Sequence, residues 1–319
     1  MSKYVFNGVN TLSVIERSAD SETCGKCSAY RVDETEQKVF SGVFEGSDGY
    51  GEVVYPEYDD RSGAFIGSRI AASAAINWFS SDRCQFDDHD ADRLRSCIDI
   101  FMRRAKRDLD YEGKPLFKKK ARTFPTSASV CAVDCASDNS VNCEFLWTGN
   151  CRGYVLDTCG LCQRPDDDIG GAQDAYGQRA VGAKLNNIIN ADIGYTINFR
   201  RIKITDPMLL ITATTAAFDD FGSPMEFEYA ILYALIKSKS VAEWEKRLGS
   251  IIREYAGDDF SMTIMSVGFT DFNHMKSYYE PRIKQLIDRY IRPLNAARKG
   301  EARVNVGALW NQYKNEYYR

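Results

Sequence analysis

The sequence has no run of 18 or more apolar residues, so it contains no segment typical of a membrane-spanning helix. Its N-terminal segment also lacks the continuous apolar stretch and the small-residue cleavage site of a secretory signal. There is no excess of basic residues: 41 Lys and Arg stand against 45 Asp and Glu, a net charge of −4, so the basic footprint of a nucleic-acid-binding protein is missing. We therefore expect a cytoplasmic protein whose partners are neither membranes nor nucleic acids.

Local signatures of several enzyme classes are missing as well. The sequence has no Gly-x-Ser-x-Gly elbow of a serine hydrolase and no Gly-rich phosphate loop of a nucleotide-binding protein. It has only two histidines, His89 and His274, and neither lies in a metal-binding spacing. No internal repeat, low-complexity segment or linker is visible, which predicts a single domain over residues 1–319.

Cysteine is present in ordinary amounts, with ten residues, four of them in two Cys-x-x-Cys pairs. Four thiolates can hold zinc, but the 132 positions from Cys27 to Cys159 far exceed zinc-ribbon spacing. A redox dithiol at Cys24 and Cys27 lacks the expected strand–helix context. Because no secretion signal is present, we interpret the cysteines as reduced thiols without a shared function.

Hydrophobic periodicity predicts strands and helices in alternating groups. Strands are expected over residues 30–44, 127–133, 143–148, 153–157, 161–163, 196–204, 208–213 and 260–269. Helices are expected over 64–79, 87–110, 225–237, 241–255 and 274–294, with mixed helical character over 172–190 and a loop over 46–62. Helices arrive in pairs between groups of strands, which predicts an α+β fold: a four-layer α-β-β-α sandwich of two mainly antiparallel sheets flanked by helix pairs. Residues 270–319 would then be a C-terminal helical extension.

Four short segments, each at a predicted strand end, carry a more specific pattern. They are Gly42–Gly46, Trp147–Leu156 with its continuation Gly160–Gln163, Met208–Asp219 and Gly257–Ser261. In this order they resemble motifs of the protein phosphatase 2C family of metal-dependent serine/threonine phosphatases: V-F-D-G, G-D-S-R-x-Y, an apolar strand ending in Thr/Ser-Asp-Gly, and D-[DN]-x-[ST]. The resemblance extends over roughly residues 25 to 270.

The resemblance implies two Mg²⁺ or Mn²⁺ ions that are held by carboxylates and activate a water for attack on a phosphoserine or phosphothreonine. It makes Glu45, the backbone carbonyl of Gly46 and Asp258 metal ligands. Thr215 stands where the third motif has its aspartate, and Ala216 stands for the following glycine. A hydroxyl carries no charge and is a poor Mg²⁺ ligand. Glu45 keeps a carboxylate but moves its oxygens by about 1–1.5 Å, a displacement that costs activity.

The remaining ligands are harder to assign from the resemblance. An early acidic ligand is expected before Glu45, and Asp33 and Glu34 are the candidates. Arg31 is the candidate for the phosphate-binding arginine, although Cys27 is an alternative occupant of that position.

The departures from the family motifs are compatible with three functional hypotheses. Asn150 replaces the aspartate of the hairpin motif, while Arg152 is kept. Together with Thr215, this loss of charge predicts a pseudophosphatase, with impaired or lost activity, that binds a phosphoprotein or another protein partner. The alternative is an active Mg²⁺- or Mn²⁺-dependent serine/threonine phosphatase with an atypical metal site, completed by an acid such as Asp48 or Asp219. The third hypothesis is an assembly module without phosphate recognition.

Overall fold

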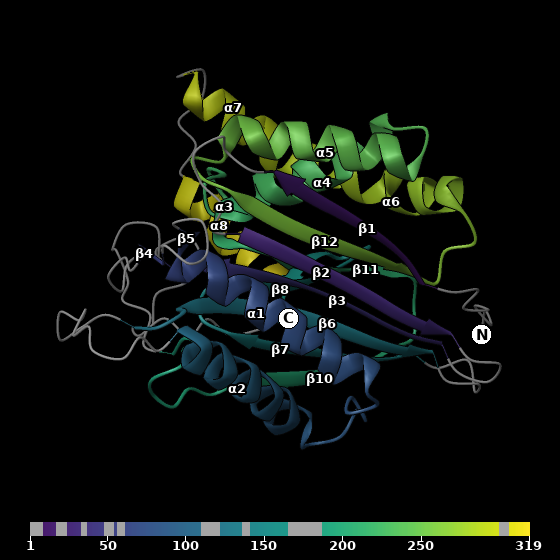
Figure 1. Cartoon of the computed structure of the whole chain (residues 1–319). Helices are drawn as coiled ribbons and strands as arrows, with labels where there is room; N and C mark the ends of the chain where they lie inside the picture. Colours follow the sequence, from purple (N-terminus) through teal and green to yellow (C-terminus); the bar gives the residue numbers. More distant parts are fainter. Residues whose placement is uncertain are drawn as a thin grey trace.

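The structure, a computed structural model, describes residues 9–16, 24–32, 37–47, 54–55, 61–109, 122–135, 141–164, 187–299 and 306–319. These residues form two five-stranded sheets with helices on their outer faces (Figure 1).

Both sheets are antiparallel between all neighbouring strands. Sheet A runs in the order β1 (Val9–Glu16), β12 (Phe260–Val267), β11 (Met208–Ala213), β8 (Arg152–Asp157) and β9 (Gly160–Gln163). Sheet B runs in the order β10 (Asn198–Ile204), β7 (Val141–Thr148), β6 (Thr126–Cys135), β3 (Gln37–Gly46) and β2 (Cys24–Val32). The short strands β4 (Val54–Tyr55) and β5 (Arg61–Ser62) pair separately.

The inner faces of the two sheets pack on each other and form a dry core layer, to which Phe145, Val155 and Met265 belong. Because side chains alternate between the faces of a strand, the next residue on β7, Leu146, points to the outer face of sheet B. There it packs beneath the helices α1 (Gly63–Ser80) and α2 (Asp90–Leu109). Burial on both faces explains why nearly all residues of β6, β7 and β8, the polar ones included, are inaccessible to solvent.

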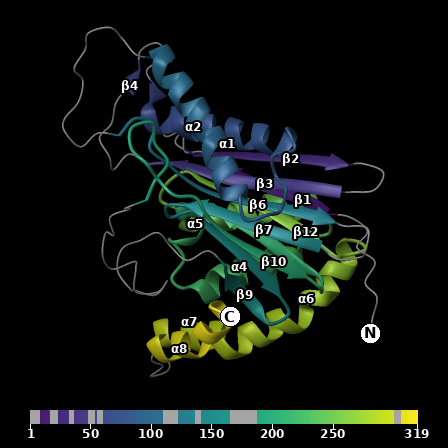
Figure 2. The same ribbon diagram turned by 90° about the horizontal axis from the view of Figure 1, so that it is seen from below.

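The outer face of sheet A is covered by α4 (Pro224–Lys237), α5 (Val241–Tyr255) and α6 (Phe272–Leu286). Figure 2 shows the resulting order of layers, with α1 and α2 on one side of the strands and α6 on the other. The predicted α+β fold, a four-layer sandwich of two antiparallel sheets between helical layers, is therefore confirmed.

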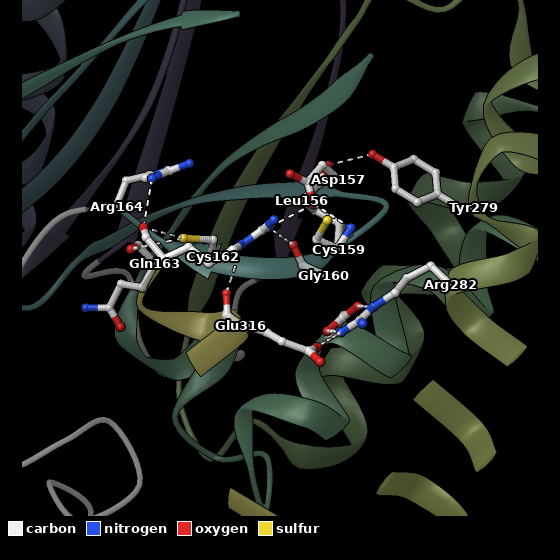
Figure 3. A network of polar contacts seen from close by, with 12 residues as sticks. Leu156, Asp157, Cys159, Gly160, Cys162, Gln163, Arg164, Tyr279, Arg282 and Glu316 are labelled. Atoms are coloured by element: carbon white, nitrogen blue, oxygen red, sulfur yellow. Dashed lines mark hydrogen bonds and ion pairs between the residues drawn. The ribbon is translucent and has the colours of Figure 1, made fainter. Parts of the chain in front are cut away.

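The C-terminal helices complete the layer on sheet A. α6 continues through a π-helical turn (Ile287–Ile291) into α7 (Arg292–Arg298), and α8 (Val306–Tyr317) packs on the edge strand β9. Figure 3 shows Arg282 of α6 and Glu316 of α8 pointing toward each other beside Gly160. Gly160 has a φ of +119°, and a Cβ there would lie 2.2 Å from the Arg282 guanidinium, so only glycine fits.

Several local predictions need correction. The strand β1 was not predicted, and the loop expected over 46–62 contains β4 and β5. Residues 187–190 are not helical, since Ile189 forms a bridge to Thr126, while 172–186 lie outside the described residues. The helix expected over 274–294 continues to Arg298. None of the helices that the structure describes is long and apolar enough to cross a membrane.

Candidate functional site

Three chain segments meet where β3 and β11 end and β12 begins. β3 ends at Glu45 and Gly46, and the residues after β11 form the short helix α3 (Thr215–Phe218). Thr214 fixes this junction through its backbone and its side chain: Thr214 N donates to Ser261 O of β12 at 2.9 Å, and Ser261 N donates to the hydroxyl oxygen Thr214 Oγ1 at 2.8 Å. The ends of motifs one, three and four are thereby brought to one edge of the sandwich.

The Glu45 carboxylate contacts Thr215 directly. Its Oε2 atom accepts hydrogen bonds from the Thr215 backbone N–H at 3.0 Å and from the Thr215 hydroxyl at 2.8 Å. The thiol of Cys151, in the hairpin before β8, lies 3.6 Å from the same oxygen. Glu45 and Thr215, the two positions at which the sequence departs from the family's metal ligands, are thus joined by two hydrogen bonds.

Burial is the main cause that raises the pKa of the Glu45 carboxyl group, although part of the residue remains exposed. The hydrogen bonds from Thr215 and Cys151 act in the opposite direction, because they favour the ionised form. The nearby negative charge of Asp258 raises the pKa further. Asp258 is therefore close enough to Glu45 to interact electrostatically, as expected if both belong to one site.

Gly46 packs tightly against the beginning of α1. A Cβ at this position would lie 2.4 Å from the carbonyl oxygen of Ala64, so any side chain would push β3 away from the helix. The small residue is therefore required by packing whether or not its carbonyl binds a metal. As a metal ligand, Gly46 stays a prediction.

Asp258 lies exposed in the turn between α5 and β12. Its Oδ1 accepts a hydrogen bond from the backbone N–H of Asp259 at 2.7 Å. The turn is tied to the end of α3 by Asp220, whose carboxylate accepts from Gly257 N at 2.9 Å. This second connection was not visible in the sequence, because Asp220 lies one residue beyond the motif that was aligned.

The hairpin motif supplies a packing residue. Arg152 is buried, and its guanidinium lies 4.4 Å from the ring centroid of Phe218 in α3. This cation–π contact is favourable for arginine and stabilises the position of α3. Cys151, directly before it, was missed as a site residue; its place in the hairpin motif was the available signal.

Arg31 lies far along β2 from the Glu45 end of sheet B. In the register of β2 with β3, Cys24 pairs with Glu45, whereas Arg31 pairs with Lys38. The seven residue steps from Cys24 to Arg31 span roughly 24 Å in a strand. That separation does not favour Arg31 as a phosphate-binding residue beside Glu45, the role predicted from the sequence. The other acidic candidates, Asp33, Glu34 and Asp48, lie outside the described residues.

The site residues that the structure describes do not by themselves fit a pair of divalent metal ions. Within the described ranges, Glu45 and Asp258 belong to no group of three metal-binding side chains whose ligand atoms all lie within 4.8 Å of one another. The Oε2 atom of Glu45 already accepts two hydrogen bonds from Thr215 and lies beside the Cys151 thiol. With Glu45 and Asp258 alone, two cations at this edge would have too little negative charge to offset their mutual repulsion.

Comparison of the sequence with protein-family models and with curated proteins finds no match. Comparison of the structure does. The serine/threonine phosphatase PstP of Mycobacterium tuberculosis matches 82% of this chain and 99% of its own length, with a TM-score of 0.52 at 13% identity. The phosphatase Stp1 of Staphylococcus aureus matches 82% of this chain and 95% of its own, with a TM-score of 0.55 at 13% identity.

This chain has the protein phosphatase 2C fold. PppA of Pseudomonas aeruginosa adds a third match, with a TM-score of 0.53 at 10% identity over 82% of this chain and 99% of its own. The resemblance read from four sequence motifs is thus confirmed at the level of the fold, while identities this low leave the activity to be argued from the site.

Exchanging Thr215 for valine is expected to destabilise the protein by about 1 kcal/mol at pH 7, because Glu45 loses the hydroxyl donor and keeps only the backbone N–H. Valine preserves the branched shape. Thr215→Ser is the matched control, since it keeps the hydroxyl and should cost less. Urea unfolding of the three proteins measures the effect. A stable Thr215→Val protein beside a destabilised Thr215→Ser protein would show that the methyl group, not the hydrogen bond, matters.

Proposed function

We propose that this protein is a pseudophosphatase: a protein phosphatase 2C fold whose metal-binding edge is closed by a hydrogen bond in place of a metal pair. The observation that carries the proposal is the 2.8 Å hydrogen bond from the Thr215 hydroxyl to Glu45 Oε2. At this position the family resemblance implies two carboxylates that share cations. Here one partner is a neutral donor, which satisfies the remaining carboxylate directly.

The electrostatics support the same conclusion. Burial and the charge of Asp258 raise the pKa of Glu45, whereas the hydrogen bonds from Thr215 lower it by favouring the ionised form, so the threonine acts on this carboxylate as a cation would. Without the ions there is no Lewis acid to lower the pKa of an attacking water. Hydrogen bonds among this chain's own residues hold β3, α3 and the turn before β12 together. The fold therefore keeps its shape at this edge without bound metal ions.

We further propose that the retained fold binds a phosphoprotein or another protein partner, and that residues 1–319 act as one phosphatase-like domain, with 270–319 as its C-terminal helical extension. The nearly complete coverage of the matched phosphatase chains supports a single domain. An edge that keeps the phosphatase framework while losing the metal chemistry suits recognition of a partner better than turnover.

The direct test is an assay of the full chain with Mn²⁺ or Mg²⁺ and a small aryl phosphate. We expect no hydrolysis above the buffer rate. Mn²⁺-dependent turnover that disappears in Asp258→Ala but persists in Asp288→Ala, an exposed acid on the C-terminal helices, would instead establish an active enzyme with an atypical site.

Partner recognition is measured separately with a phosphoserine or phosphothreonine peptide library and the matched unphosphorylated library. Preferential retention of the phosphorylated peptides by the full chain supports phosphoprotein binding. Equal retention of both libraries points to a protein partner recognised without its phosphate, and no retention of either contradicts the proposed peptide recognition.

A further inference from the structure

A group of three potential metal ligands lies beneath the end of α1, away from Glu45. Cys84 belongs to the loop between α1 and α2, Asp90 begins α2, and Glu144 lies on β7. Each offers one ligand atom, and these three atoms all lie within 4.8 Å of one another. The three residues are 2%, 0% and 0% exposed, so the group is fully enclosed between the helices and sheet B.

This group is separate from the phosphatase-like edge. Gly46 contacts Ala64 in the first turn of α1, whereas Cys84 follows the last turn. The 18 residues of α1 span roughly 27 Å at the rise of an α-helix. A ligand bound at Cys84 is therefore independent of what happens at Glu45.

Glu144 is the residue that points to a ligand. Both carboxylate oxygens are buried, and neither accepts a hydrogen bond from an N–H group that the structure describes. The neighbouring Asp90 is a hydrogen-bond partner only while one of the two carboxyl groups is protonated. Arg201 forms an ion pair with Glu144, with Nε 3.5 Å from Oε1, but this contact does not amount to a hydrogen bond. Buried carboxylates are normally hydrogen-bonded, paired closely or bound to a metal, because isolation from water is strongly unfavourable.

Asp90 is held in a fixed orientation with one coordination position to spare. Its Oδ1 accepts a hydrogen bond from Gln85 N at 3.0 Å and also binds the Arg93 guanidinium. Its Oδ2 accepts one hydrogen bond, from Asp87 N at 3.1 Å. Since each carboxylate oxygen has two lone pairs, Oδ2 retains one that can bind a cation. The surrounding loop thus positions this carboxylate before any ligand arrives.

Protons are the competing occupants of the group. Burial, with Asp90 as the next cause, raises the pKa of Glu144 to about 9. Burial and the two neighbouring carboxylates also raise the pKa of the Cys84 thiol. A cation that displaces these protons would leave a thiolate and two carboxylates. Arg93 and Arg201 offset their negative charge only in part, because these arginines also pair with Asp87 and Asp88, so a divalent ion has negative charge left to neutralise.

We propose that Cys84, Asp90 and Glu144 form a binding site for a divalent transition-metal ion of the zinc class. A thiolate combined with two carboxylates matches the sulfur and oxygen ligands that Zn²⁺ and Co²⁺ accept, whereas Mg²⁺ and Ca²⁺ favour oxygen alone. Three protein ligands leave a fourth tetrahedral position for a small ligand such as water. The ion would join the α1–α2 loop to sheet B and stabilise that outer layer.

Cobalt substitution tests the site without relying on any activity. The full reduced chain, stripped of metal, is titrated with Co²⁺ and followed by absorption. We expect a thiolate-to-cobalt charge-transfer band that saturates at one equivalent, is lost on adding Zn²⁺ and is unaffected by Mg²⁺. The absence of this band in the unmodified protein would overturn the proposal, whatever the behaviour of the variants.

The variants identify the ligands. Cys84→Ser should abolish the charge-transfer band, and Glu144→Gln should weaken Co²⁺ binding by more than about 10-fold, because replacing a residue that only orients a metal ligand already lowers metal affinity by about 10–100-fold. Cys159→Ser, which removes an exposed thiol, is the control and should leave both unchanged. Circular dichroism verifies folding of each variant. A band that persists in Cys84→Ser but disappears in Cys159→Ser would place the metal on surface thiols and refute the site.

Discussion

Replacing Thr215 by aspartate and Ala216 by glycine in one variant is expected to give the protein a Mn²⁺-dependent stability that the unmodified chain lacks. The double change restores the Asp-Gly pair that the family resemblance implies at the end of β11. It places a second carboxylate where Thr215 now donates to Glu45 at 2.8 Å. Two carboxylates at this distance repel each other, so a cation between them has charge to bind.

The size of the effect follows from linkage between binding and folding. Without metal, the variant should be less stable than the unmodified protein, since it loses a hydrogen bond and gains a like-charge contact. With Mn²⁺ at about 100 times its dissociation constant, binding adds about 2.7 kcal/mol to the free energy of unfolding. In a protein of 319 residues that corresponds to a rise in Tm of roughly 4 °C. Thermal unfolding with and without Mn²⁺ measures it.

A neutral variant separates charge from shape. Thr215→Asn combined with Ala216→Gly has the same size and backbone freedom but no added carboxylate, so Mn²⁺ should leave its Tm unchanged. If the unmodified protein responds to Mn²⁺ as strongly as the restored variant, and Asp258→Ala removes the response while Cys84→Ser keeps it, then Glu45 and Asp258 already suffice to hold the ion. The pseudophosphatase proposal would not survive that result.

The parts of the fold that were predicted are those encoded by local periodicity. The apolar spacing over residues 64–79 predicted α1, and short apolar runs predicted β6, β7 and β8, since both faces of these strands are buried. β1 was missed because its pattern is short and its partner, β12, lies about 250 residues away in the sequence. Pairing over that distance leaves no local signal.

In the candidate site, too, local motifs predicted the positions of residues but not their contacts. The motifs placed Glu45, Thr215 and Asp258 at strand ends, and the structure brings Glu45 and Thr215 into contact although 170 residues separate them. The motifs could not show that the threonine hydroxyl would bond to the carboxylate, nor that Cys151 would lie beside it, because both depend on side-chain geometry. The distance of Arg31 from Glu45 was not predictable for a related reason, since it depends on strand register; its role in phosphate binding stays a prediction.

Arg282→Met is expected to lower the free energy of unfolding by about 3–5 kcal/mol, the usual cost of leaving one partner of a buried ion pair alone. Arg282 and Glu228 are 2% and 0% exposed, and the guanidinium binds both carboxylate oxygens, at 2.6 and 2.9 Å. The Tyr313 hydroxyl donates to Glu228 at 2.5 Å, and Glu316 adds a second ion pair to Arg282. The network therefore joins α4, α6 and α8.

In Arg282→Met, Glu228 stays buried without its cation, and this uncompensated charge causes most of the loss of stability. Methionine fills much of the volume of the arginine side chain, so the loss reflects charge more than packing. Removing the stranded carboxylate as well, in Arg282→Met with Glu228→Gln, should recover part of the stability, with a coupling energy of roughly 0.5–3 kcal/mol. Urea unfolding of the two single variants and the double variant completes the cycle. Additive losses would mean that the two side chains stabilise the C-terminal helices separately, through their packing, and that the ion pair itself contributes little.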